Sequence, residues 1–227
     1  DNEKDNEKDN EKDNEKDKKN KTDKPTFIYE SIQTNPTLFV DVSNQYYHTV
    51  QQKMKDTDYI EHKSITTFID KSMNNFLFLG YILLMFPNIK IIHCKRYFLD
   101  NALSIYFHKS EDISQCWTTN LKNIITYYKI HNELLDHWIS IFQPDIINVH
   151  YETLVSNPED TIKKLLHFCK LEWNPNYLNF YKNKRTFFSL GSYKVRNPIS
   201  TKFIGIWKHY EKYIGELISH AKHKNLV

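Results

Sequence analysis

The feature that most constrains the fold is a regular alternation of short apolar runs with longer stretches of helical spacing. Two runs, IKIIHC at 89–94 and DIINVHYE at 145–152, have the length and β-branched content of strands. Helical patterns surround and separate them, at 74–86, 99–108, 117–142, 159–169 and 207–222. A short run that is apolar almost throughout is typical of a strand buried on both faces, as in parallel sheets. The sequence therefore predicts an α/β fold with a mainly parallel sheet flanked by helices.

The chain begins with a segment of very different composition. Residues 1–16 are four copies of DNEK, and no apolar residue occurs before Pro25. Such a segment has nothing to bury, so we expect residues 1–24 to form a disordered, low-complexity tail and residues 25–227 to form one domain. Within that domain, spacing predicts a helix over 37–55 and a short strand, ITTFI, over 65–69.

Charge separates the tail from the rest. The net charge of the whole chain is +3, but residues 1–24 carry ten acidic residues and eight lysines. The remainder therefore carries 18 acidic residues and 23 Lys and Arg residues, a net charge of +5. A modest excess of this kind suits a small anionic ligand, and the scattered basic residues argue against nucleic acid.

Cysteine and hydropathy patterns bear on metal binding, membrane insertion and cellular compartment. The three cysteines are far apart and form no CxxC pair, so we expect no metal site, and their sparse, odd number favours a reducing compartment. No apolar run approaches the ~18 residues of a membrane span, and no signal peptide opens the sequence. These patterns predict a cytoplasmic protein.

Chemistry-bearing residues gather after the run at 89–94. Arg96 follows that strand, and in open α/β sheets ligands bind beyond the carboxyl ends of the strands. Asp100 or Asn101 is expected to cap the next helix, and Ser104 lies on its first turns. A guanidinium fork and a hydroxyl near a helix start predict a phosphate clamp; the alternative is a surface ion pair and a solvated serine. GxxxxGK[ST] and GxGxxG loops are both absent from the sequence.

Four segments in order resemble sulfotransferases that use 3′-phosphoadenosine 5′-phosphosulfate, in particular the bacterial-type and tyrosylprotein-type branch often fused to tetratricopeptide repeats. The segments are FIDKSMNNFLFLG (68–80), FPNIKIIHCKRYFLDNALSIYF (86–107), INVHYETLVSNPEDTIKKLLHFCKLEWNP (147–175) and YKVRNPISTKFIGIWKHYEKYI (193–214). The resemblance implies a P-loop nucleotide-kinase-like fold. It also implies transfer of a sulfuryl group to a hydroxyl or amine on a small molecule, a glycan or a protein tyrosine, without a metal. Bacterial-type members are cytoplasmic and tyrosylprotein-type members work in the Golgi lumen, so the resemblance implies the Golgi lumen as the alternative compartment if an anchor is missing from this chain.

The resemblance also implies roles for individual residues. Arg96 and Ser104 match the pair that grips the 3′-phosphate of the nucleotide, and Tyr151 matches a tyrosine near it. Lys71 matches the lysine that contacts the sulfuryl group and the leaving phosphate. The counterpart of the general base is Glu30, with an ordinary exposed glutamate as the alternative. The segment expected to close over the nucleotide contributes Arg196 and Lys202.

The sequence departs from the family pattern in three places. A loop of the type Pro-Arg-Ser-Gly-Thr-Thr, which cradles the 5′-phosphosulfate in the family, has no counterpart here, and the DNEK tail stands in its place. Met73 replaces a proline two residues after Lys71, and Arg-Asp-Pro reads Arg96-Tyr97-Phe98. We therefore expect an N-terminally truncated domain: a fragment, a mis-assembled gene product or a degenerate member. The rival interpretations are a domain that binds nucleotide or a partner without turnover, and a basic, aromatic-rich nucleic-acid binder.

Overall fold

A computed structural model describes residues 35, 37–55, 67–108, 113–183 and 196–227. The chain divides into two compact units, residues 1–65 and 66–227. The described part of the first unit is chiefly the helix α2 (Leu38–Lys55), which confirms the helix expected at 37–55. The expected tail and the boundary after residue 24 lie outside the described residues.

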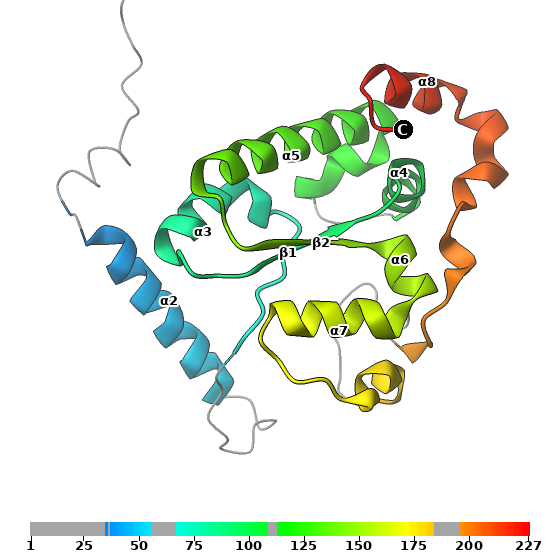
Figure 1. Ribbon diagram of the computed structural model, residues 1–227. Coiled ribbons are helices and arrows are strands. Elements are labelled where there is room, and N and C mark those ends of the chain that lie inside the picture. The colour runs from blue at the N-terminus through cyan, green and yellow to red at the C-terminus, as the bar shows by residue number, and fades with distance from the viewer. Residues whose placement is uncertain (1–34, 36, 56–66, 109–112, 184–195) are drawn as a thin grey trace, which may run out of the picture. The chain divides into compact units, whose positions relative to one another are not determined.

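The second unit is built on two parallel strands, β1 (Ile91–Lys95) and β2 (Ile146–His150). Their register pairs Ile91 with Ile146 and, at the other end, Lys95 with His150. A parallel pair needs a crossover connection, and here it contains the long helix α5 (Leu121–Phe142). Figure 1 shows α5 and the helix α3 (Leu79–Met85) on one side of the strands, and α7 (Pro158–Phe168) on the other. The α/β class with a parallel sheet flanked by helices is thus confirmed.

The remaining elements follow the predicted order, with several patterns split into a 3₁₀ and an α segment. They are η1 (Asn75–Phe78), α4 (Phe98–Tyr106), η2 (Ile113–Thr119), α6 (Tyr151–Ser156), η3 (Pro175–Lys182), η5 (Thr201–Phe203), η6 (Ile206–Tyr213) and α8 (Gly215–His223). The pattern over 207–222 is therefore two helices and not one. Likewise the run at 145–152 ends as a strand at His150, because the next two residues open α6.

The strand expected at 65–69 is wrong for its described part. Residues 67–69 form no strand, and Ile69 is 79% exposed. Strands gain their stability from a neighbouring strand and from burial of one face, and β-branched composition alone supplies neither. The burial expected for 89–94 also needs correction, since β1 is only half-buried and Cys94 is exposed.

Two apolar clusters hold the second unit together, one among the helices and one between helices and the sheet, and α5 contributes to both. The first joins α4, α5 and α8 through Phe98, Leu99, Ala102, Leu103, Ile124, Ile125, Ile214, Leu217 and Ala221. The second joins α3, α5 and the sheet through Leu79, Leu83 and Leu135, with Trp138 packed against them. Because one helix supplies both clusters, the position of α4 is linked to that of the sheet.

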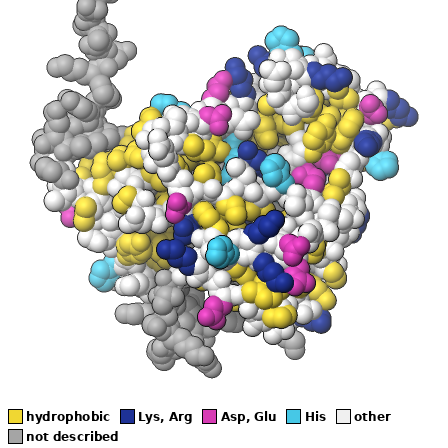
Figure 2. All heavy atoms as spheres, viewed as in Figure 1, with side chains coloured by type: hydrophobic (Ala, Val, Ile, Leu, Met, Phe, Trp, Pro, Cys, Tyr) yellow, Lys and Arg dark blue, Asp and Glu magenta, His cyan; other side chains and the backbone are white. Residues whose placement is uncertain are grey.

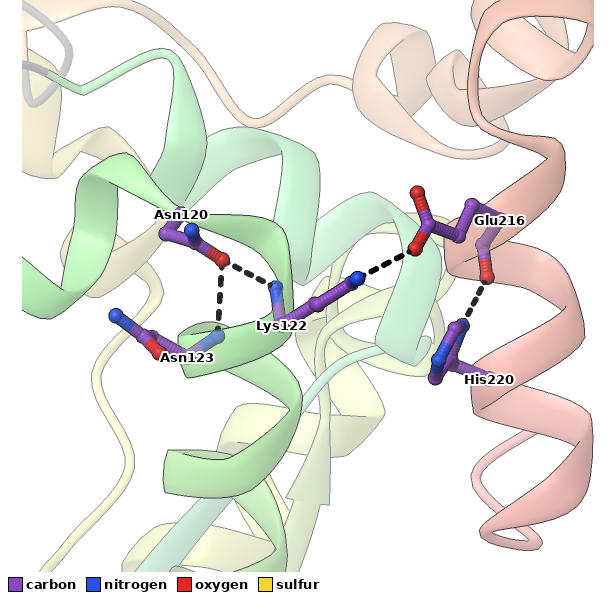
Figure 3. Close-up of polar contacts among 5 residues, drawn as sticks. All are labelled: Asn120, Lys122, Asn123, Glu216 and His220. Carbon is purple, nitrogen blue, oxygen red and sulfur yellow. Dashed lines mark hydrogen bonds and ion pairs between the residues drawn. The ribbon is translucent and has the colours of Figure 1, made fainter.

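Polar contacts mark where α5 begins beside α8 (Figure 3). Asn120 caps α5, since its side-chain oxygen accepts hydrogen bonds from the backbone N–H groups of Lys122 and Asn123. The Lys122 ammonium also lies 2.8 Å from the Glu216 carboxylate on α8. Both side chains of this ion pair are about two-thirds exposed, so burial of Leu217 on α8 contributes more to docking of that helix than the ion pair does.

A histidine on β1 gives the fold a pH dependence. The His93 ring centroid lies 5.3 Å from that of His131 on α5, and its Nδ1 lies 3.0 Å from the Asn148 side-chain oxygen. Burial, followed by the charges of His131, Lys95 and His150, lowers the pKa of His93 from 6.5 to about 4, although the Asn148 hydrogen bond opposes this. A depressed folded-state pKa means that the stability supplied by the neutral ring is present above pH 6.5. It is lost as the pH falls toward 4.

We expect His93 to account for roughly 1–2 kcal/mol of the loss of stability between about pH 7 and pH 4, because solvent screens the half-exposed ring. Urea denaturation at a series of pH values measures this loss. The variant His93→Gln should show a shallower decline than the native chain, whereas His167→Gln, at an exposed position on α7, should not. An unchanged decline in His93→Gln would assign the pH dependence to other groups.

Candidate functional site

A cleft of about 590 Å³ opens at the carboxyl ends of the two strands. Lys95 and His150 end the paired strands at its floor, and Arg96 follows at once. The start of α4 and residues 204–208, from the C-terminal part of the chain, form its walls. The lining residues are Lys95, Arg96, Tyr97, Phe98, Asp100, Tyr128, His150, Glu152, Ile204, Gly205, Trp207, Lys208 and Leu226. The cleft therefore lies where open α/β sheets place their ligands.

Two contacts hold the Arg96 side chain in this cleft. Its guanidinium carbon lies 4.6 Å from the centroid of the Tyr151 ring, which is the geometry of a cation–π contact. One terminal nitrogen, Nη2, donates a 2.7 Å hydrogen bond to the backbone carbonyl of Phe203. The Nε–H group is buried and has no hydrogen-bond partner among the described residues. A buried donor without a partner is costly, so the site favours an acceptor near this guanidinium.

Two carboxylates fix the backbone around Arg96. Glu152, on α6, accepts a 2.9 Å hydrogen bond from the N–H of Tyr97, the residue that precedes α4. Asp100, only 3% exposed, accepts hydrogen bonds from the N–H groups of Gly205 (2.7 Å) and Trp207 (2.9 Å). Both acids are thus bonded to main-chain donors. The expectation that Asp100 or Asn101 caps α4 is wrong, because the helix begins earlier, at Phe98, with Tyr97 at the cap position.

Two tyrosines, Tyr151 in contact with Arg96 and Tyr128 in the lining of the cleft, remain neutral at physiological pH. Burial raises the pKa of Tyr151, and the nearby Glu152 and Asp100 charges add to this effect although Arg96 opposes it. Burial and Glu152 likewise raise the pKa of Tyr128. Both phenols therefore keep their protons and are able to donate hydrogen bonds. Since the acids are already bonded to the backbone, the side chains left to face a ligand are mainly cationic or neutral.

The residues singled out from the sequence are distributed unevenly. Arg96 and Tyr151 are in contact. Lys202 is next to Phe203 in the chain, and its ammonium lies 4.9 Å from the centroid of the Phe203 ring. Ser104 is exposed on α4 and is not among the residues that line the cleft. Lys71 is also exposed, in the segment before η1.

The structure places neither of the other two predicted site residues in the cleft. Arg196 is exposed at the start of the described segment 196–227, and Glu30 lies outside the described residues. Sequence reasoning missed Glu152 altogether and gave Asp100 the wrong role. A buried acid in the first turn of a helix is visible in the sequence, but its partners, more than 100 residues away, are not.

No group of three or more His, Cys, Asp or Glu side chains in the described ranges is arranged to hold a metal ion. No helix in the same ranges is long and apolar enough to span a membrane.

Comparison with known protein families shows which family the chain belongs to. The model of the sulfotransferase family matches residues 2–175, well over half of the chain. The chain belongs to the sulfotransferase family. The match includes Arg96, Ser104 and Tyr151, whereas Arg196 and Lys202 lie beyond it. The resemblance identified from the four sequence segments is therefore confirmed at the level of the family, while the bacterial-type and tyrosylprotein-type branch stays a prediction.

One relative adds to this result. An uncharacterized protein of Aquifex aeolicus (strain VF5) is 36% identical over 160 residues, which make up 70% of this chain. The aligned part is only 21% of that protein, so this sulfotransferase chain spans about a fifth of the relative's length.

Proposed function

We propose that this sulfotransferase binds 3′-phosphoadenosine 5′-phosphosulfate in the cleft and transfers its sulfuryl group to a hydroxyl or amine acceptor. The observation that carries the proposal is the state of Arg96. It stands at the carboxyl end of a parallel strand, is held against Tyr151, and has a buried N–H donor without a partner among the described residues. A phosphate group supplies the acceptor that this geometry lacks.

Arg96 is suited to the 3′-phosphate of the nucleotide. A guanidinium has five N–H donors, of which the Phe203 carbonyl takes one, so a fork remains for phosphate oxygens. Lys95 and Lys208 add positive charge along the same cleft. Ser104 enters the proposal through the family resemblance, as the hydroxyl that shares this phosphate. On the face drawn in Figure 2, basic and acidic side chains are intermixed, which favours a small anion over a polyanion.

The transfer itself is an in-line displacement at sulfur. The acceptor oxygen or nitrogen forms a bond to sulfur while the bond from sulfur to the bridging oxygen breaks, and the electron pair of that bond stays on the 5′-phosphate. A fixed cation stabilises this developing charge, and Lys71 is the proposed one. The acceptor's proton passes to a general base, for which Glu30 is the candidate. The second candidate function is nucleotide binding without turnover, which the engagement of both cleft acids by the backbone favours.

Calorimetry with adenosine 3′,5′-bisphosphate and adenosine 5′-monophosphate tests the nucleotide site. We expect the bisphosphate to bind more tightly, and Arg96→Ala to weaken its binding by at least about tenfold, because a charge-assisted hydrogen-bond pair is lost. Lys129→Ala removes one exposed cation from α5 and serves as the matched control, with no change expected.

Equal affinity for the two nucleotides would contradict the proposal. If the bisphosphate binds, release of this product from 3′-phosphoadenosine 5′-phosphosulfate in the presence of a panel of alcohols, phenols, amines and glycans separates transfer from binding alone. Release of the bisphosphate that depends on an acceptor supports the enzyme. If no acceptor in the panel leads to release, the result supports a domain that binds nucleotide without turnover.

A further inference from the structure

The C-terminal segment that borders the cleft is attached to α4 by one buried side chain. We call residues 200–213 the strap; it contains η5 and η6. Asp100 accepts hydrogen bonds from the strap N–H groups of Gly205 and Trp207, at 2.7 and 2.9 Å. Gly205 has φ of +73°, in the left-handed region, and this turn lets two alternate N–H groups converge on one carboxylate.

The hydrogen bonds between Asp100 and the strap matter because the Asp100 carboxylate is buried. Asp100 is 3% exposed, and burying a carboxylate is unfavourable unless hydrogen bonds compensate the lost hydration. Among the described ion pairs none involves Asp100, so the bonds to the strap are what the structure shows in compensation. The charged acceptor makes both bonds stronger than neutral ones.

The strap returns to Arg96 two residues before Gly205. There the Phe203 carbonyl accepts the 2.7 Å hydrogen bond from Arg96 Nη2. Arg96 and Asp100 flank the start of α4, so the two side chains and the strap form a closed loop of contacts. A long arginine side chain otherwise has considerable rotamer freedom, and here the carbonyl and the Tyr151 ring restrict it.

We propose that Asp100 is a positioning residue for nucleotide binding: it fixes the strap so that the Phe203 carbonyl orients the Arg96 guanidinium in the cleft. The proposal rests on the nucleotide site proposed above. Asp100 does not touch the nucleotide in this scheme, and its effect reaches the ligand through the strap and Arg96.

The first test compares Asp100→Asn in two backgrounds. The amide keeps one acceptor oxygen and presents N–H donors to the other strap N–H, so one bond is lost and the charge is removed. We expect affinity for adenosine 3′,5′-bisphosphate to fall about tenfold in the native background. When Arg96 is already alanine, the same change should alter affinity by less than about twofold, because residues that act together are not additive. An equal loss in both backgrounds would overturn the proposal.

The second test loosens the strap without altering the buried acid. Gly205→Ala introduces a side chain at φ of +73°, and the new Cβ would meet nothing closer than 3.9 Å, so the cost is backbone strain. Gly215→Ala, where a Cβ would meet nothing within 4 Å and no positive φ occurs, is the matched control. We expect Gly205→Ala to weaken bisphosphate binding several-fold and Gly215→Ala to leave it unchanged. Equal effects would contradict the role of the strap, even if Asp100→Asn failed to fold.

A readout that needs no ligand separates this proposal from the nucleotide site. In the NMR spectrum, the Arg96 Nε–H signal, assigned by its loss in Arg96→Lys, should exchange slowly in the native chain and faster in Asp100→Asn. If exchange is faster in Asp100→Asn but the native chain binds no bisphosphate, the nucleotide site is refuted and the positioning of Arg96 by Asp100 still stands. Unchanged exchange and affinity in a variant that is only less heat-stable would reduce Asp100 to a structural role.

Discussion

Replacing Phe98 with alanine is expected to lower the free energy of unfolding by about 3–5 kcal/mol, the largest single effect predicted for this chain. Phe98 is 2% exposed and lies in the cluster formed by α4, α5 and α8. Its ring meets that of Tyr128 edge-to-face, with centroids 4.9 Å apart. Truncation leaves a cavity at the start of the helix that follows Arg96. Urea denaturation monitored by circular dichroism measures the loss.

Phe98→Pro is the informative comparison, because the family resemblance places a proline at this position. Phe98 is the first residue of α4, where proline is well tolerated, and Tyr97 has a ψ of 128°, outside the α region that a following proline disfavours. We therefore expect the proline variant to lose about as much stability as the alanine variant, since both lose the ring. A much larger loss in Phe98→Pro would indicate that the backbone, and not ring packing, dominates at this position.

Gly80→Ala is expected to destabilise the chain by about 1–3 kcal/mol, although alanine normally favours a helix over glycine. Gly80 is buried in α3, and a Cβ there would lie 2.7–2.8 Å from three ring carbons of Trp138 on α5. The indole fills the space in which a methyl group would stand, so α3 and α5 would have to move apart. Thermal denaturation of the variant and the native chain shows whether the substitution lowers or raises stability.

A double mutant identifies the cause of the Gly80 effect. In a Trp138→Leu background the smaller side chain leaves room for the methyl group, so Gly80→Ala should then be nearly neutral or stabilising. A loss of the same size in both backgrounds would exclude the contact with Trp138 as its origin.

The elements most readily predicted were those whose pattern is local. The runs at 89–94 and 145–152 have apolar composition and helices around them, and both form strands. The pattern at 65–69 has a similar composition, yet its described residues, 67–69, are exposed and form no strand. What separates them is a neighbouring strand, which a propensity does not encode. The breaks between 3₁₀ and α segments, as at Gly215, likewise depend on packing against other helices.

The candidate site was predictable only in part, for the same physical reason. Arg96 was predicted because the end of a parallel strand is a place defined by local pattern, whereas Tyr151 was predicted only through the family resemblance of the segment around it. Asp100 and Glu152 bond to backbone N–H groups, which every residue carries except proline, so no side-chain motif reveals those partners. The carbonyl of Phe203 is invisible to the sequence for the same reason.

The contacts of the cleft join residues that are synthesised far apart in time. The carboxylate that accepts the hydrogen bond of the Tyr97 N–H lies 55 residues downstream. The backbone groups that bond to Arg96 and Asp100 lie more than 100 residues downstream. A nascent chain can pair β1 with β2 while Arg96 and Asp100 still lack the partners that hold them. The sheet with α3 and α5 is therefore able to assemble first, and the edge that carries the cleft is completed only when the strap emerges from the ribosome.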